Sequence, residues 1–207
     1  MSRRFVYKLM YDSGGAPCVS DGLLSLAICK PQIRQSAARG DWVYGFGGNH
    51  DRPPNRLVFI ARVSERLPSG RYYELSEYAD RADAIYAWDG HGQLTLRADA
   101  QFHVDVTDHV RQKDIGTYPA FEKANVLVSD DYRYFGHLAS DGWKTSCPHL
   151  AAAVERLGQG HLVRHSIEVC GELQTLQTRL WKQHSRMDVG RPTIETDQTA
   201  GPCRTRN

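Results

Sequence analysis

The sequence predicts an α+β domain in which a bent mixed β-sheet, or a partly open β-barrel, carries flanking helices and a C-terminal helix. Strand-like segments rich in β-branched and aromatic residues dominate the first two-thirds of the chain. Two helical patterns close it. Helices that are segregated from the strands are typical of an α+β fold and not of a doubly wound one.

Each element is predicted from its local pattern. Strands are expected at residues 5–11, 23–29, 42–47, 56–65, 84–88, 93–97 and 125–129. Helices are expected at residues 32–39, 72–78, 148–157 and 162–182, the last with apolar residues at helical spacing. Segments dense in Gly, Pro, Ser and Asp predict loops at 12–22 and 48–55, and a further loop is expected at 130–136.

The length of 207 residues predicts one domain over residues 1–183. Residues 184–207 are polar and lack periodicity, so we expect a disordered tail there. No apolar run approaches the ~18 residues of a membrane span, and the N-terminus has no apolar signal core. We therefore expect a cytoplasmic protein without a membrane partner.

The five cysteines are odd in number and widely spaced, without a CxxC pair. They are expected to be free thiols, and a structural zinc site is not expected. His103 and His109 lie near Asp105 and Asp108, but no third ligand is evident. We therefore predict neither a metal nor any other cofactor.

Arginines crowd one stretch with few acidic residues, although the formal net charge of the chain is only +2. Arginine binds phosphate bidentately. The candidates for contact with DNA phosphates are Arg34, Arg39 and Arg52. A solvated basic face is the alternative interpretation.

Two segments carry candidate catalytic residues. Cys18 ends a Gly-rich loop stiffened by Pro17, and Asp12 precedes that loop as a possible proton carrier. Cys29 and Lys30 follow an apolar strand and precede a helix start, where a ligand group can be held. Core packing of the two thiols and an ordinary exposed lysine are the alternatives.

Aromatic residues at two places are candidates for holding a flat ring. Alternation places Trp42, Tyr44 and Phe46 on one face of a strand, which is either the core or a stacking wall. A second group follows a buried strand, where acids, an arginine and aromatics can read and enclose a base or form a structural corner. The candidate base-binding residues are Pro17, Trp42, Tyr44, Phe46, Asp130, Tyr132, Arg133 and Phe135.

The runs AICKPQIR and GDWVYGFG, followed by RLVFIARV and later by DYRYFG, resemble the nucleotide modification associated domain family. The resemblance covers roughly residues 5–136 and implies a PUA-like or EVE-like domain that holds a base in a cleft. It also implies a place in systems that install 7-deazaguanines in DNA. There the nitrile of the inserted base preQ0 is hydrated to the amide. The resemblance implies that a small protein of this family is a candidate for that hydration step.

Under this resemblance a thiolate attacks the nitrile carbon, water then adds, and the thiol leaves. Cys18 or Cys29, Asp12 and Lys30 supply the required residue types without a metal. A route in which Asp12 or Asp130 activates water directly stays open. The implied partners are DNA that carries a modified base and other proteins of a DNA modification system.

Three functions follow from the sequence. The first is an enzyme that hydrates preQ0 in DNA, and the second is a reader that binds a modified base without chemistry. The third, a generic RNA-binding module, would show salt-dependent binding without base preference.

Overall fold

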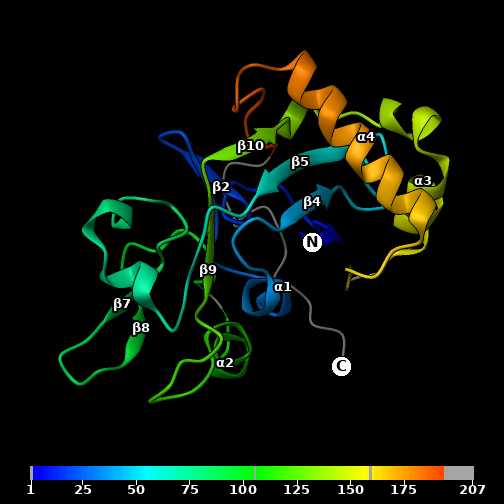
Figure 1. Cartoon of the computed structure of the whole chain (residues 1–207). Coiled ribbons are helices and arrows are strands. Elements are labelled where there is room, and N and C mark those ends of the chain that lie inside the picture. Colours follow the sequence, from blue (N-terminus) through cyan, green and yellow to red (C-terminus); the bar gives the residue numbers. More distant parts are fainter. Residues whose placement is uncertain (1, 105, 159, 194–207) are drawn as a thin grey trace.

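The computed structural model describes residues 2–104, 106–158 and 160–193, which contain two open β-sheets joined by a bend (Figure 1). The five-stranded sheet has the order β10 (Asp131–Tyr134), β5 (Leu57–Arg62), β4 (Trp42–Phe46), β1 (Arg4–Lys8) and β11 (His161–Leu162). Its β1 and β4 run parallel, and its other neighbours run antiparallel.

The second sheet has four antiparallel strands in the order β2 (Cys18–Ser20), β3 (Leu23–Leu26), β9 (Val126–Ser129) and β6 (Glu65–Leu67). A separate hairpin pairs β7 (Tyr86–Trp88) with β8 (Leu94–Leu96), as the turn residues between them predict.

Two chain segments cross from one sheet into the other, and they make the bend. The segment from β5 to β6 crosses at Ser64, and the segment from β9 to β10 crosses at Asp130. The amide of Ser64 donates to the carbonyl of Val128 over 2.8 Å, and the Ser64 hydroxyl bonds the Asp130 carboxylate. The prediction of a bent mixed sheet is thus confirmed, and the described strands form open sheets.

Helices cover the two sheets separately. Helices α3 (Pro148–Arg156) and α4 (Ile167–Gln183) lie together along β4 and β5 (Figure 1). Their Leu150 and Leu173 are fully buried in one core with Tyr44. Ser166 caps α4 by accepting from the amide of Val169, so the helix begins later than the apolar spacing predicted.

A second core lies beneath the four-stranded sheet. It joins Ala27, Ile28 and Tyr86 to Ile115 of α2 (Asp108–Ile115). The remaining elements are α1 (Pro31–Ser36) and the 3-10 turns η1 (Arg71–Glu74), η2 (Ser76–Tyr78), η3 (Gly136–Leu138) and η4 (Gly142–Ser146).

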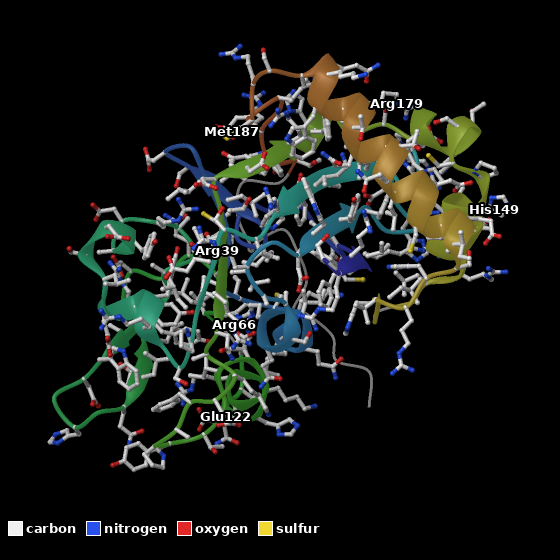
Figure 2. All side chains as sticks on the ribbon, in the orientation of Figure 1. Arg39, Arg66, Glu122, His149, Arg179 and Met187 are labelled. Carbon is white, nitrogen blue, oxygen red and sulfur yellow. The ribbon has the colours of Figure 1, made fainter. Side chains whose placement is uncertain are left out.

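Residues 184–193, which we call the strap, are not a disordered tail as predicted. They run beside β10, where the amide of Tyr134 donates to Met187 and the amide of Val189 donates to Tyr134, each over 2.9 Å (Figure 2). A β-carbon on Gly190 would lie 1.9 Å from the carbonyl oxygen of Phe135. The strap is polar and has no periodicity, but these backbone hydrogen bonds and the close packing of Gly190 hold it against β10. The predicted tail from 194 to 207 lies outside the described residues.

Four smaller expectations differ from the structure. The expected loop at 130–136 forms β10 and η3, and the expected loop at 12–22 contains β2. The expected helix at 72–78 is two 3-10 turns, and the expected strand at 56–65 divides at the bend. Among the described residues, no helix combines the length and the apolarity needed to cross a membrane.

Candidate functional site

The backbone turns sharply at the end of β3, between the two sheets and α1. Cys29 and Lys30 both have positive φ angles, of 59° and 44°. Non-glycine residues rarely take this conformation, and they tend to do so at functional sites. Pro31 then starts α1 at a position where its missing N–H costs nothing. The turn presents Cys29 and Lys30 side by side.

Arg34 of α1 fixes this turn from below. Its side chain is fully buried, and Nε donates to the carbonyl of Cys29 over 2.7 Å. Nη2 donates to the carboxylate of Asp114 over 2.6 Å. The guanidinium is therefore enclosed by α2 and the loop behind it. The prediction that Arg34 contacts a DNA phosphate is wrong, because its side chain is fully buried.

Cys29 lies against a histidine from a distant loop. Its Sγ is 3.6 Å from Nε2 of His103, and the thiol side chain keeps part of its surface exposed. The sequence indicates His103 only as a candidate metal ligand, because 74 residues separate it from Cys29. A thiol beside an imidazole is the arrangement that activates cysteine nucleophiles.

Tyr7 of β1 lies next to this pair, within the interior. The ammonium of Lys30 lies 5.2 Å from the centre of its ring. Burial raises the pKa of Tyr7 well above its usual value, and the neighbouring Cys29 and Asp12 add to the effect. Its hydroxyl has no hydrogen-bond partner among the described residues. Tyr7 therefore stays neutral and keeps a donor available.

Asp12 also lies near Tyr7, and it is bonded to the strap. It is buried and accepts from the hydroxyl of Tyr134 over 2.7 Å. Thr193 of the strap lies 3.5 Å away through Oγ1, which itself accepts from Arg56. Burial raises the pKa of Asp12 above its ordinary value, against the effect of these donors. Asp12 can thus hold a proton more readily than an exposed carboxylate.

Cys18 is not placed with these residues at an open site. Its side chain is buried, and its carbonyl accepts from Arg81 over 3.0 Å. Burial, with the Asp83 carboxylate nearby, raises the pKa of Cys18 to about 12. Pro17 before it is also buried. A thiol with that pKa is almost fully protonated at neutral pH, so of the two cysteines only Cys29 has the surroundings of a nucleophile.

The glycines of the loop before Cys18 pack against other parts of the protein. A β-carbon on Gly15 would lie 2.9 Å from the ring of Phe102, and one on Gly14 would lie 3.1 Å from Pro192 of the strap. The sequence predicted that a ligand approaches this glycine backbone closely. In the structure the side chains of Phe102 and Pro192 occupy that space.

The aromatic residues of β4 belong to the core. Tyr44 and Phe46 are fully buried, the first bonded to the carbonyl of Leu173 and the second packed on Trp143. Trp42 packs edge-on against Trp181 of α4 at 5.3 Å. Alternation along a strand does not distinguish a core face from a stacking wall, and here the face meets α3 and α4.

The residues of β10 and its flanks lie beside the end of α4, the strap and the bend. Tyr132 donates to Asp188 over 2.5 Å, and Arg133 lies 4.4 Å above the ring of Trp181. Phe135 packs on His184, and Asp130 is exposed at the bend. None of these residues is brought to Cys29.

Of the predicted phosphate contacts, Arg39 and Arg52 do lie at the surface. Arg39 and Arg66 line a groove of about 670 Å³ along β6 and β9, which also contains Asp130 (Figure 2). Arg52 is exposed elsewhere and bonds carbonyls of its own loop. Because Glu65 and Asp130 line the groove together with the two arginines, its charges balance and it is not a basic surface.

Comparison with known proteins adds the family. No curated protein matches the chain. Among solved structures, the crystal structure of ASCH from Zymomonas mobilis matches with 11% identity and a TM-score of 0.35, over 84% of this chain and 94% of that one. The model of nucleotide modification associated domain 2 matches residues 1–199. The chain therefore belongs to the nucleotide modification associated domain 2 family, which places it in nucleotide modification systems.

Proposed function

We propose that this protein hydrates the nitrile of preQ0, a 7-deazaguanine base, within DNA and that Cys29 is the nucleophile. The observation that carries the proposal is the 3.6 Å approach of Cys29 Sγ to His103 Nε2 on a partly exposed turn. Membership of a nucleotide modification family supports a base as the substrate. Cys18 is not part of the proposal, because its thiol is buried and its pKa is raised to about 12.

The proposed reaction has two stages and balances as the addition of one water. First, His103 takes the thiol proton, Sγ of Cys29 bonds to the nitrile carbon, and the nitrile nitrogen takes a proton, which gives a thioimidate. Water then adds to that carbon, and His103 passes one of the water protons to the imine nitrogen, which becomes the NH2 group. When the carbon–sulfur bond breaks, sulfur leaves with its electron pair, the remaining hydroxyl proton passes through His103 to sulfur, and the carbonyl of the amide forms.

Three neighbours serve this chemistry in the proposal. The neutral Tyr7 hydroxyl donates to the nitrogen as negative charge develops there. Lys30 adds positive charge beside the same turn. Asp12, whose pKa burial raises, supplies or accepts a proton from the side of the strap. Each acts from a fixed backbone position in β1, the turn or the loop after β1.

The test is direct. Purified protein is incubated with an oligonucleotide that contains preQ0, and the nucleosides are analysed by mass spectrometry. The wild type should convert the nitrile to a product heavier by one water, Cys29→Ser should abolish conversion, and His103→Gln should slow it at least about 100-fold. Cys170→Ser, which removes a partly exposed thiol on α4, is the matched control and should react normally. An unchanged nitrile at high protein concentration would overturn the proposal.

The partner in this proposal is DNA that carries the modified base. Arg39 is the remaining phosphate candidate that lines the groove. Arg39→Ala should weaken binding of all DNA sequences alike and reduce its salt dependence. If Cys29→Ser and wild type bind preQ0-DNA in preference to plain DNA and neither converts it, the protein is a reader of the base.

A further inference from the structure

Two buried polar atoms near Cys29 form no hydrogen bond within the described part of the fold. The hydroxyl of Tyr86 and Oδ2 of Asp114 have no hydrogen-bond partner there, although their residues are only 2% and 5% exposed. Protein interiors rarely leave such groups unpaired, because the lost hydration is not recovered. An unpaired donor and an unpaired acceptor point to a group that arrives from outside.

Each residue is linked through one neighbour to the segment that leads to Cys29. Arg34 connects one of them, because it bonds Asp114 Oδ1 through Nη2 and the carbonyl of Cys29 through Nε. The ring of Tyr86 packs edge-on at 5.5 Å against Tyr73, whose hydroxyl donates to the carbonyl of Ala27. Burial and then the Asp114 carboxylate raise the pKa of Tyr86, and Cys29 contributes in the same direction.

The chemistry of the pair is complementary to one edge of a guanine-like base. Tyr86 stays neutral and offers an O–H donor. Asp114 offers one carboxylate oxygen, since Arg34 occupies the other. A 6-oxo group beside a ring N–H presents the matching acceptor and donor. In a 7-deazaguanine the substituent on carbon 7 neighbours that 6-oxo group, so a base held by this edge directs its nitrile along the same side.

We propose that Tyr86 and Asp114 bind the 6-oxo and N–H edge of the base whose nitrile reaches Cys29, and that they determine which base is accepted. The inference rests on the proposed function for the identity of the substrate. It assigns the two residues to specificity and not to the bond-making steps.

The experiment measures binding in a Cys29→Ser background, where no turnover interferes. The two probes are single-stranded oligonucleotides with either 7-cyano-7-deazaguanine or 7-cyano-7-deazaadenine, which exchanges the 6-oxo group for an amine. The parent should prefer the first by at least about tenfold in Kd, equivalent to about 1.4 kcal/mol. Adding Tyr86→Phe or Asp114→Asn should reduce the preference to within about twofold.

Tyr73→Phe is the matched control, because it removes a buried hydroxyl that does have a partner. It should keep the base preference and lower the melting temperature. Tyr86→Phe should lose the preference and melt at the same or a higher temperature, because its hydroxyl pairs with nothing in the described fold. If Asp114→Asn does not fold, Tyr86→Phe decides.

Equal affinity of the Cys29→Ser protein for both oligonucleotides would overturn the inference. So would a Tyr86→Phe variant that keeps the full preference, since the two atoms would then hold only a buried water. The proposed function fails separately. A wild type that hydrates preQ0 without base preference refutes only the specificity pair, whereas a preference without hydration refutes only the chemistry.

Discussion

Replacing Arg34 with methionine should destabilise the protein more than any change at its surface. The guanidinium donates five hydrogen bonds to the interior: to the carbonyls of Cys29, Lys123, Asn125 and Asp114, and to the Asp114 carboxylate. Methionine fills similar space but leaves that carboxylate buried without its cation. Removing one partner of a buried pair costs about 3–5 kcal/mol, a large share of a typical total of about 5–15 kcal/mol.

Urea denaturation followed by tryptophan fluorescence measures the loss. With a slope of about 2 kcal/mol per molar urea, the midpoint should fall by about 1.5–2.5 M. The double variant Arg34→Met with Asp114→Asn should recover at least about 1 kcal/mol relative to the sum of the single changes, because the unpaired charge is gone. A loss below about 1 kcal/mol for Arg34→Met, or strict additivity, would refute the reasoning.

Three further outcomes follow from the structure. Iodoacetamide should label Cys29 well before Cys18, whose thiol is buried with a pKa raised to about 12, and peptide mapping that finds equal rates would contradict the assignment. Burial raises the pKa of Asp12 above 3.8, so the stability that its protonated form contributes is complete below pH 3.8 and is lost as the pH rises through the pKa of the folded protein. The stability of Asp12→Asn relative to wild type should therefore rise across this pH window and stay constant above it. Urea midpoints measured along a pH series test this. Gly190→Ala should detach the strap, because the new methyl group meets a backbone carbonyl at 1.9 Å, and should speed proteolysis there, whereas Gly171→Ala in α4 has open space and should stabilise the helix by about 0.5–1 kcal/mol.

The sequence supports the bent α+β architecture because its long strands and helices repeat their patterns locally. Contacts between distant segments cannot be predicted from such local patterns. The approach of His103 to Cys29 spans 74 residues, and no motif marks it. Helix α2 is not predicted from the sequence, because most of its residues are polar and its helical pattern is weak. Its Asp114 is connected to the site by the ion pair with Arg34, which the sequence indicates as a contact for DNA phosphate.

The candidate site shows the same division. The sequence selected Cys29, Lys30 and Asp12, and the structure gathers them around Tyr7. The sequence also indicated Tyr44 and Phe46 as base-binding residues, but both are buried in the core. An alternating aromatic strand has the same pattern whether a helix or a ligand covers it, so only the packing of α3 and α4 decides.

The strap also closes an edge of the five-stranded sheet. Strand β10 is the last strand on that side, and Met187 and Val189 occupy the hydrogen-bonding groups that Tyr134 turns outward. An uncovered edge strand is a template for pairing with another chain. A chain cut after Gln183 would therefore present that template, and we expect its first visible defect to be self-association and not the loss of a catalytic group.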